Sequence, residues 1–459
     1  MISRENKQRA EELRKLLERE GFCKIQFYIQ EQSGFEINVF MQEADRKIIS
    51  EELSVFVEAW KNDRRYYTYA NNLEIPEEIA CRMKETDSLE KHAGQEEKQA
   101  VPWSGNICGE QQGSVKEQKS PYTEEMRCAE GVLKRAEHAA LAHGADVVNE
   151  CACYQQRTAT AIYHPDHQWM EDEGEYRYMG ISCIAREDGD TAAAYCGAYG
   201  MWEKDFSPEA LAKEAAVDAK DCLHSRVLSS GNYPVLLKNT VMAELLEAYL
   251  PIFYGSAMQE GMSRLSGREK TKIAAAWLDI VEDPKLDGGR ETRTIDDEGT
   301  AVQKKYIVRE GNFETALYHH TSARESGEKQ STGNGFKVDF RSEISTGVTN
   351  VEMRRSDGKG KTLEELMMTA GEGILVTGID GTFAGVNTRT GSFSLISKGI
   401  VIRDGKKAEA FSQVTIAGNF YDMLEQMREM GNDYAETSPS AAFVRAPSVY
   451  VRNLTVSGK

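Results

Sequence analysis

The sequence lacks the features that mark membrane and exported proteins. No window approaches the ~18 uninterrupted apolar residues that a membrane-spanning helix requires. The first residues, MISRENKQRAEELRKLLEREG, are charged and contain no apolar core of a signal peptide. The nine cysteines are odd in number and have no paired spacing, so we expect reduced thiols rather than a disulfide framework. These absences predict a cytoplasmic protein without membrane contact.

Positive charge is also scarce. The chain has 56 Lys and Arg residues against 74 Asp and Glu residues, which gives a net charge of −18. Proteins that bind nucleic acid usually present a basic face to the phosphates, and no basic stripe with interleaved aromatic residues is found here. We therefore expect no direct binding to nucleic acid.

Familiar catalytic motifs are missing as well. The sequence contains no HExxH, HxxEH or CxxC metal motif, no GxSxG elbow and no P-loop. The segment GVNTRTG at 385–391 is bounded by glycines, but an expected strand rather than a helix follows it. Because a phosphate cradle needs a helix N-terminus at that point, we reject a nucleotide site there.

Three histidine pairs are close in sequence: His138 with His143, His164 with His167, and His319 with His320. The first pair is separated by roughly 140° on an expected helix, so a partly exposed pair is favoured over a zinc site. The second pair flanks Pro165-Asp166, which favours a plain turn over a weak ligand pair. The third pair lies on an expected strand, where adjacent side chains point to opposite faces.

Hydrophobic residues make up 40% of the 459 residues, which is enough for several cores. A length of this size favours about three units of ~150 residues. We predict a mixed α+β fold, in which an N-terminal α/β region packs on a C-terminal β-rich, antiparallel, barrel-like domain with a few helices. The predicted segments are an N-terminal α+β domain (1–85), a polar linker or long loop (86–120), a central helix-plus-strands region (121–228) and the C-terminal domain (229–459).

Hydrophobic periodicity predicts the elements of the first half. Helices are expected at 4–20, 75–83, 123–143 and 208–225, and strands at 25–29, 35–40, 147–154, 157–163, 176–186 and 192–202. Two more apolar runs lie at 53–60 and 66–69. The acidic run EDEGE at 171–175 is interpreted as a solvated hairpin tip rather than a metal site. In the polar segment, a crossover anchored by Trp103 is as good an interpretation as a linker.

The segment from Gly371 to Gly431 is the richest in residues that mark turns and the ends of strands and helices. Strands are expected at 374–376, 392–395, 400–403 and 414–417, with a hairpin turn at Asp404-Gly405. Asn419 is expected to cap a helix that reaches Met430 and ends at Gly431. The segment therefore predicts an antiparallel β unit closed by a helix.

Polar residues beside glycines in the C-terminal half are candidates for a peptide groove: Thr332, Gly333, Asn350, Thr377, Asn387, Thr390 and Gly391. Such groups can hydrogen-bond an extended peptide backbone, as in strand addition. They can equally satisfy the hydrogen bonds of their own turns. The residues alone leave this choice open and name no reaction.

Short motifs follow one another in a recognisable order from Ser230 to the end: NYPVLL (232–237), IDDEGT (295–300), STG (331–333), TNVEM (349–353), LEELMMTAGEGILVTG (363–378), GVNTRTGSFSLISKGIVIRDGK (385–406), TIAGNFYDML (415–424), GND (431–433) and LTVSG (454–458). In this order and spacing they resemble the TldD/PmbA family, which was first described as modulators of DNA gyrase and is understood as two-subunit peptidases. Upstream, residues 206–219 are similar to the family's middle region.

The resemblance also shows where a zinc site would be expected. In the TldD-like branch, HExxxH on a helix and a cysteine near the C-terminus hold zinc. Here Ala243 and Ala248 occupy the histidine positions, Glu244 alone occupies the glutamate position, and Ala446 lies near the expected cysteine. The chain therefore resembles the PmbA, or TldE, branch. We assign it no catalytic residue, metal ligand or cofactor of its own, and expect zinc only in a catalytic partner.

This resemblance implies a metal-free subunit that pairs with a zinc-bearing TldD-like paralogue. Together the two would cut unfolded or leader peptides, with this chain contributing part of the substrate channel and a scaffold. The alternative is a stand-alone homodimeric protein that binds peptides or acts as a scaffold without proteolysis. The net charge of −18 disfavours a direct contact with DNA, as the gyrase label would imply.

Overall fold

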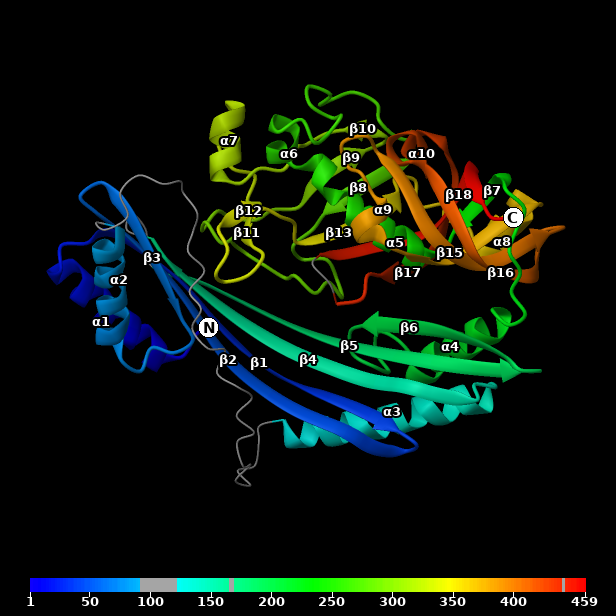
Figure 1. Ribbon diagram of the computed structural model, residues 1–459, viewed down its shortest axis with the longest axis horizontal. Coiled ribbons are helices and arrows are strands. Elements are labelled where there is room, and N and C mark those ends of the chain that lie inside the picture. Colours follow the sequence, from blue (N-terminus) through cyan, green and yellow to red (C-terminus); the bar gives the residue numbers. More distant parts are fainter. Residues whose placement is uncertain (91–121, 165–168, 440–441) are drawn as a thin grey trace.

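A computed structural model describes residues 1–90, 122–164, 169–439 and 442–459 (Figure 1). An elongated sheet with helices on one face lies beneath a C-terminal body, which we call the C-terminal domain. The predicted linker begins as helix, because α2 (Pro76–Glu90) reaches residue 90. The rest of that prediction, including Trp103, lies outside the described residues, as does most of the turn expected at 164–167.

One antiparallel sheet holds six strands in the order β3-β2-β1-β4-β5-β6. We call it the long sheet, and its strands are β1 (Cys23–Phe40), β2 (Glu43–Lys61), β3 (Arg64–Ala70), β4 (Val147–Tyr163), β5 (Met170–Glu187) and β6 (Asp190–Tyr199). β1 pairs with β4 from Phe27 opposite Tyr163 to Asn38 opposite Ala152. The predicted segments 1–85 and 121–228 therefore share this sheet.

Several strand predictions for this region were wrong in their boundaries. The strands expected at 25–29 and 35–40 are the single strand β1, and those expected at 147–154 and 157–163 are the single strand β4. The acidic run at 171–175 is not a hairpin tip but part of β5. In each case polar residues on one face interrupted the apolar pattern, although hydrogen bonding to neighbouring strands continues through them.

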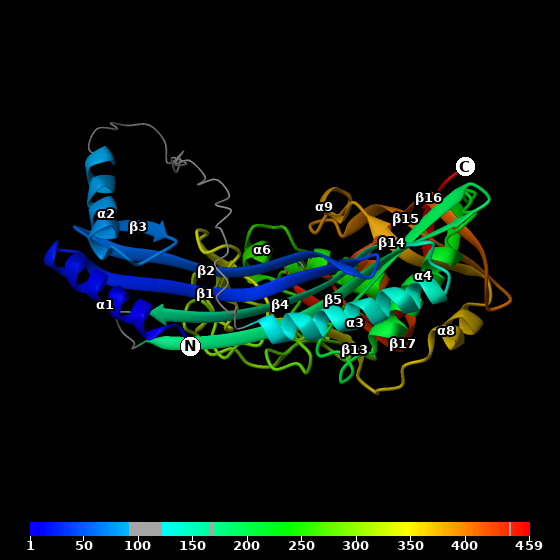
Figure 2. The same ribbon diagram turned by 90° about the horizontal axis from the view of Figure 1, so that it is seen from below.

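The four described helices of this region lie on one face of the long sheet (Figure 2). α1 (Arg4–Arg19) and α2 cover one end, and α3 (Thr123–Ala142) and α4 (Pro208–Asp221) cover the other. Alternation along β1 explains this, because Phe27, Ile29, Phe35 and Ile37 are buried under the helices. The intervening side chains, such as Gln30, face the C-terminal domain.

The C-terminal domain contains a ten-stranded sheet: β7 (Gly231–Leu237), β8 (Leu278–Glu282), β9 (Lys305–Arg309), β10 (Asn312–Phe313), β13 (Asn350–Arg355), β14 (Gly373–Asp380), β15 (Ser392–Arg403), β16 (Lys406–Asn419), β17 (Met427–Glu436) and β18 (Phe443–Ser457). Strands β7, β14, β15, β16 and β18 pair in a closed ring. Only β7–β14 and β13–β18 are parallel among the described pairings. The predicted α+β class and barrel-like domain are confirmed.

Helix α5 (Asn239–Tyr249) forms the centre of this domain and packs against β14, β17 and β18. Its Tyr249 ring stacks on Phe420 with centroids 4.1 Å apart, and its hydroxyl donates to the carbonyl of Gly391 at 2.8 Å. The short helices η1 (Leu250–Phe253) and α6 (Gly255–Gln259) follow α5. α8 (Leu363–Ala370) covers Leu236 and Leu375 on another face.

Several predictions for the C-terminal domain were wrong. The strands expected at 392–395 and 400–403 are the single strand β15. The helix after Asn419 is α10 (Phe420–Gln426), and the buried residues Met427 and Met430 belong to β17. Apolar residues three apart fit both a helix and a bulged strand, which explains the error. His319 and His320 do not lie on a strand: His319 caps α7 (His320–Ser326).

The remaining described elements are short. They are the hairpin of β11 (Gly335–Lys337) and β12 (Ile344–Thr346), and the helix α9 (Thr382–Gly385). No helix in the described part of the chain is both long enough and apolar enough to span a membrane.

Candidate functional site

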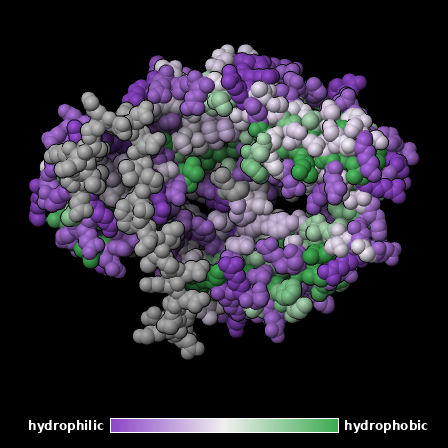
Figure 3. All heavy atoms as spheres, in the orientation of Figure 1, coloured by the Kyte–Doolittle hydropathy of each residue, from purple (hydrophilic) through white to green (hydrophobic). Residues whose placement is uncertain are grey.

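A cavity of about 680 Å³ lies between the long sheet and the C-terminal domain. Its floor is the uncovered face of β1, β4 and β5. Its roof comes from the β11–β12 hairpin, residues 290–293 and the segment that follows α5. Figure 3 shows a hollow between the two bodies, with mostly polar residues on the side of the long sheet. The cavity therefore lies where both halves of the chain contribute side chains.

The floor presents neutral amide and hydroxyl groups in matching positions of neighbouring strands. Gln30 on β1 lies opposite Thr160 on β4, and Gln32 lies opposite Thr158. Gln32 donates from Nε2 to Oε1 of Gln30 at 2.9 Å, which orients both side chains. Amides and hydroxyls both donate and accept, so this surface suits an uncharged polar ligand such as a peptide backbone.

The opposite wall is partly apolar and offers an open strand edge. Phe336, Val338 and Phe340 line the cavity, and Val338 is 86% exposed. β12 also lines it, and β11 is its strand partner. Among the described residues no strand pairs with the other edge of β12, and an edge of this kind can pair with an extended segment.

The cations at the cavity are already partnered. Arg293 lies 3.1 Å from Asp172 of β5 and 2.7 Å from Asp297. Burial opposes its charge, but the two carboxylates raise the pKa of Arg293 above its ordinary value. Lys337 Nζ lies 3.8 Å from the centroid of Phe56, and burial lowers the pKa of Lys337. These groups connect the two bodies and leave little free positive charge for an anionic ligand.

The positions expected for zinc ligands do not fit a metal. Ala243 and Ala446 are fully buried in the apolar core around α5, and Ala248 is partly buried. None of the three offers a donor atom. The one remaining carboxyl is Glu244, whose pKa is raised to about 7 by burial and then by Asp380 and Glu247. We therefore derive no metal-dependent step in this chain.

One group among the described residues has metal-like spacing, formed by Cys196, Glu214 and Asp218. The ammonium of Lys238 bonds to both carboxylates, with Glu214 at 3.0 Å. Burial opposes its charge, but Asp218 and Glu214 raise the pKa of Lys238. A buried cation therefore already supplies the positive charge here. The described histidines of the three pairs do not belong to this group.

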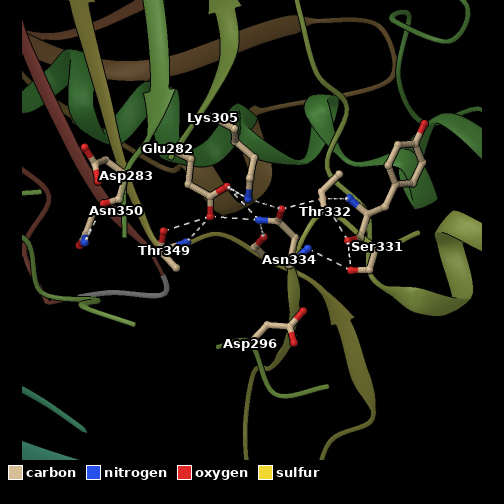
Figure 4. Close-up of polar contacts among 12 residues, drawn as sticks. Glu282, Asp283, Asp296, Lys305, Ser331, Thr332, Asn334, Thr349 and Asn350 are labelled. Carbon is tan, nitrogen blue, oxygen red and sulfur yellow. Dashed lines mark hydrogen bonds and ion pairs between the residues drawn. The ribbon is translucent and has the colours of Figure 1, made fainter. Parts of the chain in front are cut away.

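The predicted groove residues Thr332 and Asn350 lie in the framework behind the cavity wall (Figure 4), and Gly333 follows Thr332 in the chain. Thr332 Oγ1 accepts from the N–H of Tyr318 and donates to Asn334, both at 2.7 Å. Asn350 is fully buried and donates to the carbonyls of Asp283 and Glu291. Gly333 has φ +73, and a Cβ there would lie 2.7 Å from a backbone oxygen.

The centre of this framework is Glu282, which is completely buried. Its carboxylate accepts from Lys305 Nζ and Asn334 Nδ2, each at 3.0 Å, and from the N–H of Thr349 at 2.8 Å (Figure 4). The network joins β8 and β9 to the loops on either side of the β11–β12 hairpin. It therefore holds the roof of the cavity in place.

The other predicted groove residues lie in β14 and in the loop before β15. Asn387 Oδ1 accepts from the N–H of Thr390 at 2.9 Å and closes a local turn. The carbonyl of Gly391 accepts from Tyr249, and the buried Thr377 Oγ1 has no hydrogen-bond partner among the described residues. The described residues that line the cavity include none of the seven candidates. Their contact with a peptide stays a prediction.

The floor residues were not singled out from the sequence. Gln30, Gln32 and Gln156 fall in the polar interruptions that split the predicted strands. The sequence did contain a signal for these floor residues. Two neighbouring strands are interrupted by polar residues, and such a shared interruption marks the uncovered face of one continuous sheet.

Known proteins resemble this chain in sequence and in fold. Residues 230–458 match the family model described as "PmbA/TldA metallopeptidase C-terminal domain". The metalloprotease PmbA of Escherichia coli O157:H7 is 27% identical over 328 residues, which cover 71% of this chain and 68% of that protein. A metalloprotease TldD homolog of Buchnera aphidicola is 26% identical over 266 residues, which cover 56% of this chain and 54% of that protein.

Two crystal structures share the fold. TldE from Thermococcus kodakarensis superposes with a TM-score of 0.80 at 20% identity, covering 98% of this chain and all of that one. A Thermotoga maritima protein described as a modulator of a DNA gyrase gives a TM-score of 0.79 at 24% identity with the same coverage. The motifs, the sequence matches and the fold agree, and the chain belongs to the PmbA/TldD family.

Proposed function

We propose that this chain is a metal-free, TldE-like subunit of a zinc metallopeptidase complex that processes or degrades unfolded or leader peptides. A TldD-like paralogue would supply the zinc and the catalytic groups. This chain would supply part of the substrate channel and a scaffold. The observation that carries the proposal is the replacement of all three expected ligands by Ala243, Ala248 and Ala446, two of which are buried in an apolar core.

The cavity supports a role in holding peptides. Its floor of Gln30, Gln32 and Thr158 can exchange hydrogen bonds with a peptide backbone without selecting a side chain. The open edge of β12 can pair with an extended segment, and Phe336 and Val338 can contact its apolar side chains. An unfolded peptide offers all of these groups at once.

A peptidase assay tests this proposal directly. The purified chain is incubated with a fluorescently labelled unfolded casein, alone and with a zinc-bearing TldD-like paralogue, and its metal content is measured. We expect no stoichiometric zinc and no cleavage by the chain alone, and faster cleavage by the pair than by the paralogue alone. Zinc-dependent cleavage by this chain alone would overturn the proposal.

A second function, a stand-alone protein that binds peptides, has one observation in its favour. The floor and the roof of the cavity come from two halves of the same chain, from Tyr28 on β1 to Ala442 before β18. Binding of the labelled casein without any effect on a paralogue would favour this function. A neighbouring gene that encodes HExxxH would favour the peptidase complex.

A further inference from the structure

Acidic residues outnumber basic residues around the cavity. The described residues that line it include six carboxylates and three cations: Asp172, Glu173, Glu247, Glu291, Asp297 and Asp339 against Arg290, Arg293 and Lys337. Arg293 holds two of these carboxylates, and Arg290 lies 2.7 Å from Glu291. Lys337 Nζ donates to the carbonyl of Ser342. Negative charge therefore exceeds positive charge in this lining, and the low-dielectric walls of a cleft concentrate its field.

One exposed carboxylate lies beside the floor of the cavity. Glu52 on β2 is directly opposite Gln32 on β1, and opposite residues of an antiparallel pair share a face. Because Gln32 lines the cavity, Glu52 faces the same side of the long sheet. Its side chain is exposed and forms no ion pair with any described residue. Neighbouring strands are about 4.7–4.9 Å apart, so a long side chain on a peptide that contacts Gln32 can reach Glu52.

A second exposed carboxylate lies on the roof. Asp339 lines the cavity between β11 and β12, and its Oδ1 accepts from the backbone N–H of Arg341 at 2.8 Å. No described cation forms an ion pair with Asp339. Val338, the neighbouring lining residue, is 86% exposed. An apolar side chain next to a carboxylate suits lysine, which packs its aliphatic stem on apolar surface and keeps its ammonium among polar groups.

We propose that the cavity selects unfolded peptides that carry lysine or arginine, and that Glu52 and Asp339 are the residues that set this preference. The neutral floor holds the peptide backbone and does not distinguish sequences. The selection comes from the two carboxylates at its margins, each of which contacts a basic side chain. The inference rests on the proposed function in one respect, that the cavity holds a peptide, and it does not require the zinc-bearing partner.

An acidic side chain in the same place is disfavoured. It would meet carboxylates on the floor side and on the roof side, while Arg290 and Arg293 are already bound to carboxylates of the chain. The preference for basic peptides should also decrease as salt is added. Glu52 and Asp339 are exposed, and the screening length falls from ~10 Å at 0.1 M salt to ~3 Å at 1 M.

Two labelled peptides test the preference. They share a neutral, extended sequence and a neutral dye, and they differ in carrying several lysines or several glutamates at the same positions. By fluorescence anisotropy at low salt, we expect the wild type to bind the lysine peptide at least ~10-fold more tightly. Glu52→Lys should reduce this ratio of affinities at least ~10-fold.

Glu51→Lys is the matched control for Glu52→Lys. Glu51 is also exposed, but it lies opposite Ser33 on the face that the helices cover, where Ser33 Oγ accepts from Tyr122 at 2.9 Å. The control changes the net charge by the same amount, so it measures the effect of total charge alone. It should change the ratio of affinities by less than ~2-fold.

A pair of neutral substitutions tests both carboxylates together. E52Q/D339N keeps the size of each side chain, and we expect it to bind the two peptides with affinities within ~3-fold of each other. E51Q/D404N is its control, because Asp404 is exposed in the turn between β15 and β16, and it should keep the wild-type preference. Circular dichroism checks that all variants are folded.

The outcomes separate this inference from the proposed function. Measurable but equal binding of both peptides by the wild type overturns the inference and leaves the peptide-holding role in place. Binding of neither peptide overturns both. A preference that persists in E52Q/D339N, or that is lost to the same extent in E51Q/D404N, shows that Glu52 and Asp339 do not set it and overturns the inference.

Discussion

Arg293 Nε lies 3.1 Å from the Asp172 carboxylate, and this ion pair joins the C-terminal domain to the long sheet. The side chains of Asp172 and Asp297 are 6% and 3% exposed, and that of Arg293 is 15% exposed. Asp172 also accepts from the backbone N–H of Thr294 at 2.8 Å. The pair therefore fixes the position of the cavity roof over its floor.

Removing the cation from this contact should weaken the whole molecule. Arg293→Met leaves two buried carboxylates without their counter-ion, which we expect to lower the free energy of unfolding by about 3–5 kcal/mol. Urea unfolding followed by circular dichroism measures the change. Arg157→Met is the matched control, because Arg157 pairs with Glu175 at the surface with 58% of its side chain exposed. It should change stability by less than about 1 kcal/mol, and an equal loss in both variants would contradict the argument.

In the network behind the cavity, we expect a similar loss of stability on replacing one of two adjacent lysines. Lys305 lies 3.0 Å from the buried Glu282, whereas Lys304 pairs with Asp283 and is 49% exposed. Lys305→Met should therefore cost about 3–5 kcal/mol in unfolding free energy, because the buried carboxylate of Glu282 loses its counter-ion. Lys304→Met should cost under about 1 kcal/mol. If the two substitutions reduce the urea midpoint equally, Glu282 does not depend on Lys305.

Glu244 should make the stability depend on pH. Its pKa in the folded protein is raised to about 7 from an ordinary 4.5, by burial and by Asp380 and Glu247. Between these values the folded protein keeps a proton that the unfolded chain releases, so the free energy of unfolding falls as pH rises. Glu244→Gln removes this contribution, and its melting temperature should fall less than that of the wild type between about pH 5 and pH 8. Glu425→Gln, at an exposed position, should follow the wild type.

Glu298 should also make the free energy of unfolding fall as pH rises. Its pKa is raised to about 7 by burial, and then by Asp296 and Asp297 against the opposing N–H of His320. Glu244→Gln should therefore reduce the change of melting temperature with pH but not abolish it. An unchanged slope in that variant would show that Glu244 ionises as freely in the folded protein as in the unfolded chain.

Most elements could be predicted from the sequence because their apolar faces are periodic. The apolar stripes on α1 and α3 are examples, and both helices end within one residue of the bounds that the periodicity predicted. In the long sheet, the errors occur where one face of a strand meets the cavity. Polar residues between Ile29 and Phe35 hid the continuity of β1, and Asp172 was assigned to an exposed turn because its partner Arg293 lies more than a hundred residues away in sequence. No local pattern reports such a contact.

For the candidate site, the sequence could identify only the positions where zinc ligands are replaced, and not the cavity. The alanines at 243, 248 and 446 were identified by resemblance, and two of them lie in the buried core around α5. The cavity itself was missed, since it is made by the packing of two bodies. Its floor and roof are separated along the chain, and only the folded protein brings Thr158 close to Phe336.

Filling the cavity should weaken binding of an unfolded peptide. Thr158 lies at the centre of the floor on β4, so Thr158→Trp places a large ring where the peptide backbone would run. We expect at least ~10-fold weaker binding of labelled casein by fluorescence anisotropy, equivalent to about 1.4 kcal/mol. Thr191→Trp, at an exposed position of β6, is the control and should bind like the wild type. Tight binding by the Thr158 variant would place the peptide elsewhere, for example at Asn387 and Thr390 beside β15.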